Sequence, residues 1–196
     1  YELLKDKCMN NDRILINKLK SFENVNSYFL NIILALFGTI LLAVSSKVQV
    51  PFWPVPMTMQ TFVIFLIGMT YSVRLSFATV ALYLMEGAVG LPVFAKGGGL
   101  IYFIAQPSVG FLYGMLISVV LISYLADRGF SKTYLKATIS LFLGSIITFL
   151  IGVVYLGAII GFDKAIAGGL LPFIPSELFK IALAVALIPT IQKIIK

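Results

Sequence analysis

The sequence PFIPSELFK, residues 172–180, stands at the head of the last apolar run of the chain. The residues that follow it, Ile181 to Ile188, carry no charge. Because serine is a preferred N-cap residue and Pro175 lies directly before it, we expect Ser176 to begin a helix. That helix is predicted over Glu177–Ile194, which is close to the length needed to cross a bilayer.

Glu177 and Lys180 are the charged residues of this stretch, and their spacing puts them on one face of the predicted helix. Glu177 would lie in the first turn, where the helix dipole favours a negative charge. A charged side chain inside an apolar helix costs about 2.5–3.5 kcal/mol on insertion scales, so it usually has a partner or a function. Two interpretations follow: an ion pair that only neutralises both charges, or a polar site for a small solute.

Composition indicates an integral membrane protein. Hydrophobic residues make up 60% of the 196 residues and charged residues 12%, whereas a soluble domain has about 25% charged residues. The chain has no histidine and one cysteine, Cys8, which excludes an internal disulfide and most metal sites. Without histidine, neither a serine–histidine protease nor a zinc protease of the membrane can be built. No phosphate-binding loop is present, so we expect no ATP site and no enzyme activity.

The apolar runs predict an all-α membrane protein, a bundle of six transmembrane helices formed by residues 28–196. The run Leu135–Ile160 is longer than a crossing needs, so we expect this helix to tilt or bend, with Gly144 and Gly152 as candidate bend points. Residues 1–27 are predicted to be a cytoplasmic tail, and Met9 is a candidate start that would leave residues 1–8 outside the native chain. The predicted spans are Tyr28–Ser46, Thr58–Thr70, Arg74–Val89, Val109–Ala126, Leu135–Ile160 and Glu177–Ile194.

Basic residues predict the orientation of this bundle, because lysine and arginine accumulate on the cytoplasmic side. With six helices and both termini in the cytoplasm, the outer side holds only Lys47, Lys96 and Lys164. The tail and the short connections then lie inside, and three longer loops rich in proline or glycine lie outside. These loops converge on the end of the bundle where Glu177 and Lys180 lie, which predicts a pocket that opens outward.

The outer loops carry a family resemblance. Their sequences are VPFWPVPMTMQTF over Val50–Phe62, YLMEGAVGLPVFAKGGG over Tyr83–Gly99 and QPSVGF over Gln106–Phe111. Together with PFIPSELFK they resemble, in order and spacing, the BioY family, the biotin-binding S components of energy-coupling-factor (ECF) transporters. The resemblance covers about residues 35–188. It implies a multi-pass protein of a prokaryotic cell membrane that binds biotin without a cofactor. It also implies partners, namely a transmembrane coupling subunit and separate ATPase subunits.

The resemblance assigns substrate contacts to Glu177 and Lys180. Glu177 stands where the family usually has aspartate, and it can accept hydrogen bonds from the ureido N–H groups of biotin. Lys180 can donate to the ureido carbonyl or to the tail carboxylate, and the sequence leaves both open. Such charge-assisted bonds are roughly twice as strong as neutral ones.

Other candidate contacts come from the loops and the aromatic residues around them. Gly97, Gly98 and Gly99 would let backbone amides approach a ligand, or they form only a flexible turn. Tyr83 and Phe111, with Trp53 and Phe94, could pack on the biotin rings, or they are ordinary membrane-interface aromatics. Glu86 would bind the ligand or, as we slightly favour, serve as a counter-charge for Lys180. Besides Glu177, two further positions depart from the family: Gly98 and Leu112 stand where some members have asparagine and arginine.

Small residues recur every four positions on the first predicted helix, at Ala35, Thr39 and Ala43. Such a face lets another helix approach closely. In the family it docks on the coupling subunit, and the alternative is packing within the bundle.

Two other functions stay open at this point. The chain could be an S component for another small vitamin or a self-sufficient carrier, although a carrier would usually show an internal repeat, and none is evident.

Overall fold

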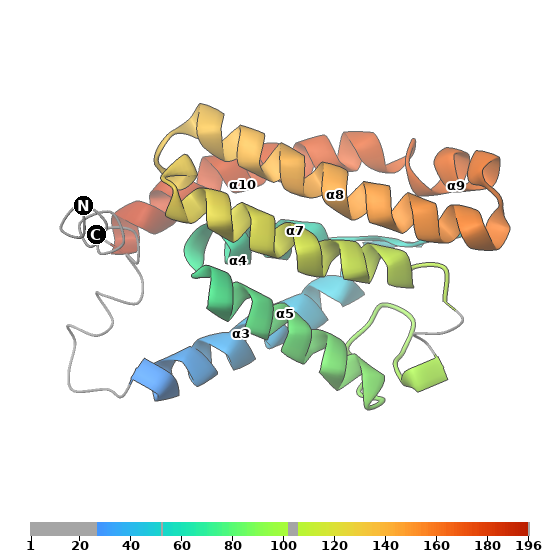
Figure 1. Cartoon of the computed structure of the whole chain (residues 1–196), viewed down its shortest axis with the longest axis horizontal. Helices are drawn as coiled ribbons and strands as arrows, with labels where there is room; N and C mark the ends of the chain where they lie inside the picture. Colours follow the sequence, from blue (N-terminus) through green and yellow to red (C-terminus); the bar gives the residue numbers. More distant parts are fainter. Residues whose placement is uncertain (1–26, 52, 102–105, 196) are drawn as a thin grey trace, which may run out of the picture.

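The computed structural model describes residues 27–51, 53–101 and 106–195, which are mostly helical (Figure 1). Residues 1–26 of the predicted tail lie outside the described residues. A two-stranded antiparallel sheet pairs Gln49 with Thr58 and Val50 with Met57. The long helices are α3 Ser27–Lys47, α4 Gln60–Thr70, α5 Val73–Ala88, α7 Val109–Asp127, α8 Tyr134–Ile160 and α10 Phe173–Ile195; the short elements are β1 Gln49–Val50, β2 Met57–Thr58, η1 Phe130–Lys132 and α9 Phe162–Gly169.

Each predicted span coincides with a helix, and most of their ends agree within two residues. By length and apolar composition, three helices of the described chain could cross a membrane, namely α3, α7 and α8. Helices α9 and α10, bent by 44° at a short break, make a fourth candidate. Helix α4 has 11 residues and α5 has 16, so neither reaches that length. The mostly helical membrane fold is therefore confirmed, whereas six crossings stay a prediction.

The start of α10 differs from the sequence prediction. The helix begins at Phe173, so Ser176 lies inside it and is not the N-cap. Pro175 is the third helical residue, a position where the missing N–H would have no intrahelical partner anyway. The proline therefore does not stop the helix, and Glu177 lies one turn deeper than the dipole argument assumed.

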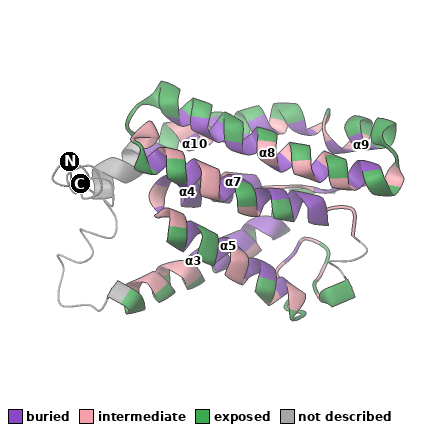
Figure 2. Cartoon of the chain, in the orientation of Figure 1, coloured by how far each residue is buried: buried purple, intermediate pink, exposed green. Residues whose placement is uncertain are grey.

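The helices form layers, with α4 and α7 between α3 and α5 on one side and α8 and α10 on the other (Figure 1). Buried residues concentrate on α4 and α7, whereas the outer faces of α3 and α8 expose large apolar side chains (Figure 2). One apolar core joins α3, α5, α4 and α7, and a second joins α4, α7, α8 and α10. The short helix α4 thus occupies the centre of the bundle, where its apolar residues are covered by protein.

Connections of different kinds lie at the two ends of the bundle. The strands, the loop after α5 and helix α9 share one end, and the tight turns from α4 to α5 and from α7 to α8 share the other (Figure 1). Lys47, Lys96 and Lys164 belong to the elements at the first end. The predicted separation of shaped loops from tight turns is seen, and which end faces the cytoplasm stays a prediction.

The glycines of α8 have a packing role. The helix is continuous across Gly144 and Gly152, the two candidate bend points. A Cβ atom would come within 2.4 Å of the Ile122 side chain at Gly144 and of the Phe111 ring at Gly152. Across the same interface, a Cβ at Gly114 would lie 2.7 Å from the Thr148 carbonyl oxygen. These glycines let α7 and α8 approach closely, and a bend at Gly144 or Gly152 stays a prediction.

The small-residue face of α3 points into the bundle. Thr39 is buried, and Ala35 and Ala43 pack against the core shared with α5. Between them, a Cβ on Gly38 would meet the Thr79 methyl group at 2.5 Å, which shows how closely α5 approaches. In this structure the face packs within the bundle, the alternative that the sequence left open, and docking of Ala35, Thr39 and Ala43 on a partner stays a prediction.

Candidate functional site

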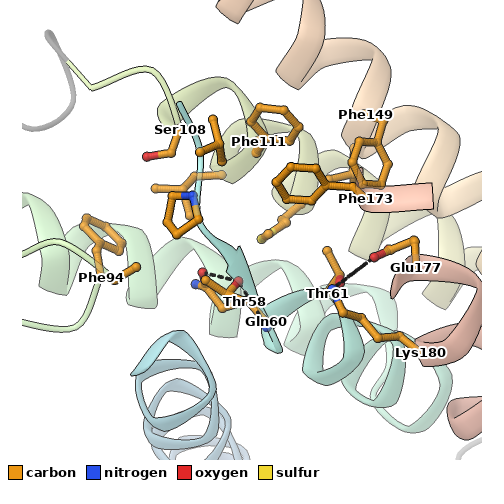
Figure 3. Close-up of a pocket in the computed structure, with 16 residues that line it drawn as sticks. Thr58, Gln60, Thr61, Phe94, Ser108, Phe111, Phe149, Phe173, Glu177 and Lys180 are labelled. Atoms are coloured by element: carbon orange, nitrogen blue, oxygen red, sulfur yellow. Dashed lines mark hydrogen bonds and ion pairs between the residues drawn. The ribbon is translucent and has the colours of Figure 1, made fainter. Parts of the chain in front are cut away.

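A small cavity lies among α4, α7, α8 and α10 at the loop end of the bundle (Figure 3). About 50 Å³ of it admits the centre of a water molecule, and the empty space is about 560 Å³ when gaps between atoms and the open mouth are included. Polar groups and aromatic rings face each other across it. Its lining residues are Val55, Pro56, Thr58, Gln60, Thr61, Phe94, Ala95, Ser108, Phe111, Leu112, Met115, Thr148, Phe149, Phe173, Glu177 and Lys180. Glu177 and Lys180 are the charged residues of that set, so the lining has no net charge.

Glu177 and Lys180 form an ion pair inside the protein. Lys180 Nζ lies 3.2 Å from Glu177 Oε2, and each residue is only 4% exposed. The i, i+3 spacing on α10 brings both side chains to the same face, as the sequence predicted. Burial matters because two charges withdrawn from water attract each other strongly but lose their hydration. Both side chains are covered by protein, so the pair is shielded from solvent, and its role in recognition stays a prediction.

Hydroxyl groups from two other helices complete the ion pair. Thr61 of α4 donates from Oγ1 to Glu177 Oε2 at 2.9 Å and accepts from Lys180 Nζ at 3.0 Å (Figure 3). Ser145 of α8 donates from Oγ to Glu177 Oε1 at 2.9 Å. The carboxylate therefore accepts three hydrogen bonds, and one network joins α4, α8 and α10.

Most of the hydrogen-bond donors and acceptors of Lys180 and Glu177 already have a partner. An ammonium group has three donors, and within the described chain Lys180 gives one to Glu177 and one to Thr61. A carboxylate has about four acceptor positions, and Glu177 fills three of them. By this count, one donor of Lys180 and one acceptor position of Glu177 have no partner within the described chain. Such a pair suits a ligand that presents an N–H next to a carbonyl.

Aromatic rings build the wall opposite these polar groups. The rings of Phe111 and Phe173 are stacked at 6.3 Å, and Phe149 packs edge-on to both at 5.9 Å (Figure 3). Phe94, which is 1% exposed, lies at another side of the cavity. The cavity thus has a polar floor and aromatic sides, an arrangement that would hold a small ring with one hydrogen-bonding edge.

Tyr83 lies behind the cavity wall and does not line it. Its hydroxyl donates to the Val93 carbonyl at 3.0 Å and accepts from Gln60 Nε2 at 2.7 Å. Its ring packs edge-on against Phe94 at 5.3 Å. Tyr83 therefore holds in place two residues that do line the cavity, whereas the sequence prediction had placed its ring on the ligand.

The glycine run also lies outside the lining and covers the end of α5. Gly99 N–H donates to the Gly87 carbonyl at 2.7 Å, and Gly97 and Gly99 both have positive φ. A Cβ on Gly98 would lie 2.4 Å from the Leu91 carbonyl oxygen. In this structure the run closes the loop that carries Phe94, so the backbone contacts predicted for Gly97, Gly98 and Gly99 are not formed at the cavity.

Glu86 is half-buried near the end of α5 and does not line the cavity. The buried partner of Lys180 is Glu177, so the role that we favoured for Glu86, a counter-charge for Lys180, is not supported. Trp53 is 74% exposed and also lies outside the lining. Of the predicted site residues, the structure brings together Glu177, Lys180, Phe111 and Phe94.

Sequence reasoning missed Thr61, Ser145, Phe149 and Phe173 as site residues. One signal was available for the first: Gln60 and Thr61 open a helix that is otherwise apolar up to Gly68. Ser145 gave no comparable signal, because a serine in a membrane helix can donate to the backbone of its own helix.

Comparison with known proteins places this chain in a family. The BioY family model matches residues 17–196, nearly the whole chain. The chain belongs to the BioY family. BioY relatives include the probable biotin transporter of Rickettsia prowazekii (strain Madrid E), 36% identical over 86% of each chain. They also include the biotin transporter of Thermotoga maritima, 31% identical over 80% of this chain and 92% of that one.

A solved structure shares the BioY fold. It is a crystal structure of the S-component for biotin from an ECF-type ABC transporter, with a TM-score of 0.76 and 22% sequence identity. The match covers 87% of this chain and 95% of that one. Three residues noted above differ from those that the BioY family usually or sometimes has. Of these, Glu177 and Leu112 line the cavity, whereas Gly98 does not.

Proposed function

We propose that this chain binds biotin in the cavity and serves as the substrate-binding S component of an ECF-type biotin transporter. The observation that carries the proposal is the buried Glu177–Lys180 pair at the floor of the cavity in a BioY-family chain. A buried ion pair contributes little to stability compared with apolar packing, so retaining one at a cavity suggests a use in recognition.

The remaining hydrogen-bonding groups favour the ureido ring as the part of biotin that meets Glu177 and Lys180. A ureido edge offers an N–H beside a carbonyl, which matches the one acceptor and one donor left over. The tail carboxylate has no donor for Glu177 and would be repelled by it. The apolar thiophane ring would then lie against Phe111, Phe149 and Phe173, and the carboxylate would stay near water at the mouth, because burying it unpaired is costly.

The rest of the assembly follows from the same proposal. We infer six transmembrane helices with both termini in the cytoplasm of a prokaryotic cell, so that the mouth of the cavity faces outward. A transmembrane coupling subunit and separate ATPase subunits would supply the energy, and this chain would catalyse no reaction. Biotin is the transported ligand and is not a cofactor.

Binding by the chain alone tests the proposal against its alternatives. The detergent-purified protein should bind biotin saturably at one site, whereas an S component for another vitamin should prefer that vitamin in competition. Uptake in cells that lack every energising subunit separates an S component from a self-sufficient carrier. Full-rate uptake in those cells would overturn the dependence on partners.

A further inference from the structure

Thr61 connects the ion pair to a second helix, which the contact between Glu177 and Lys180 cannot do. Glu177 and Lys180 are three residues apart on α10, so their contact alone fixes neither side chain relative to the other helices. Thr61 comes from α4, is 7% exposed and contacts both charges through one hydroxyl. Its hydroxyl hydrogen points to Glu177 and its lone pair to Lys180, so the contact is a directional bridge between them.

We propose that Thr61 is a positioning residue for ligand binding: its hydroxyl aims the remaining donor of Lys180 and the remaining acceptor of Glu177 into the cavity. This inference rests on the proposed function for the identity of the ligand. Thr61 fixes Glu177 Oε2, so Oε1 keeps the remaining acceptor position. Thr61 also takes one N–H of Lys180, so the third N–H is the one directed at the ligand.

Ser145 has a smaller share in this positioning. It donates to Glu177 Oε1 only and makes no recorded bond to Lys180. Without Thr61, Lys180 would keep only its contact with Glu177. Its other two N–H groups would then no longer be held in one direction relative to the cavity. The bridge therefore sets affinity through orientation and adds no charge of its own.

Two substitutions isolate the hydroxyl of Thr61. Thr61→Val keeps the side-chain shape and removes the bridge, whereas Thr61→Ser keeps the hydroxyl. The matched control is Thr79→Val, since Thr79 is fully buried on α5 and donates only to Leu75 of its own helix at 2.8 Å. Measured with radiolabelled biotin on the purified full chain, Thr61→Val should raise Kd about 10- to 100-fold, the range for a hydrogen bond to a charged group. Thr61→Ser and Thr79→Val should stay within about threefold of the parent.

A double-mutant cycle separates positioning from a structural effect. If Thr61 acts through Lys180, adding Thr61→Val to Lys180→Ala should weaken binding little further. Independent, multiplicative losses would overturn the proposal, as would parent-like affinity of a folded Thr61→Val protein.

A measurement made without ligand tests the hydrogen bond of Thr61 to Glu177 whatever ligand the protein binds. Infrared difference spectra between each protein and its Glu177→Gln derivative isolate the Glu177 carboxylate band. That band should shift in Thr61→Val and return in Thr61→Ser. If the parent fails to bind biotin but the band shifts, the proposed function falls and the bridge stands. An unshifted band in Thr61→Val refutes the bridge whatever the ligand is.

Discussion

Lys180→Ala is the substitution that tests the role of the ion pair in biotin binding most directly. It removes the cation and leaves Glu177 buried with two donors, from Thr61 and Ser145. At 3.2 Å and an effective dielectric constant of about 20, the attraction within the pair is about 5 kcal/mol. It is present with or without biotin, so its loss lowers the stability of the folded protein, offset in part because Lys180 no longer has to be desolvated. The loss of biotin binding comes instead from the charge-assisted bond between Lys180 and the ligand, and we expect about 2–4 kcal/mol, a 30- to 1,000-fold rise in Kd.

Calorimetric titration of biotin into the purified proteins measures this effect. Lys164→Ala is the control, because it removes the same charge from an exposed position on α9 outside the cavity lining. The amount and the thermal unfolding of each folded protein must be measured beside the affinity, since an unpaired Glu177 also lowers stability. If folded Lys180→Ala binds biotin as the parent does, the ion pair has no role in recognition.

The other predictions concern the carboxylate, the cavity wall and the orientation. Glu177→Gln should cost about 1–2 kcal/mol of biotin binding, less than Lys180→Ala, because the amide keeps one acceptor oxygen. Glu177→Asp should be nearly tolerated. Titrations in which either variant loses as much affinity as Lys180→Ala would contradict this. Tyr83→Phe should lower the free energy of unfolding by about 1–2 kcal/mol, because Gln60 and the Val93 carbonyl each lose a hydrogen-bond partner. The Kd for biotin should change little. A large change in Kd would put Tyr83 at the ligand. Cysteine replacing Lys96 should react with an impermeant reagent from outside the cell, and cysteine replacing Lys132 should not; external labelling at position 132 would reverse the orientation.

The sequence predicted the helices and the charged pair because both depend on local patterns. Apolar runs broken by glycine and proline located the helices, and two charges at the head of an apolar run identified Glu177 and Lys180. The start of α10 was misplaced because proline is tolerated in a first helical turn, so it gave no stop signal. Local patterns therefore sufficed wherever one helix alone determined the feature.

The rotation of each helix about its axis could not be predicted from the sequence. Residues on several faces of α3 and α5 are apolar or small, so the pattern did not reveal which side faces the bundle. As a result, the sequence left open whether Tyr83 packs on a ligand, and the structure places it against Phe94 outside the cavity lining. It also left open whether Ala35, Thr39 and Ala43 face a partner or the bundle, and in the structure they pack within the bundle. Thr61 and Ser145 were missed for a related reason: their partners lie on other helices, about 116 and 32 residues away.

A structure of the chain with biotin bound would test the central claim most directly. The account predicts the ureido ring at the cavity floor, with its carbonyl within hydrogen-bond distance of Lys180 Nζ and one N–H directed at Glu177 Oε1. The rings would lie against Phe111 and Phe173, and the tail carboxylate would point to the mouth. Biotin bound with its carboxylate on Lys180, or bound anywhere outside this cavity, would contradict it.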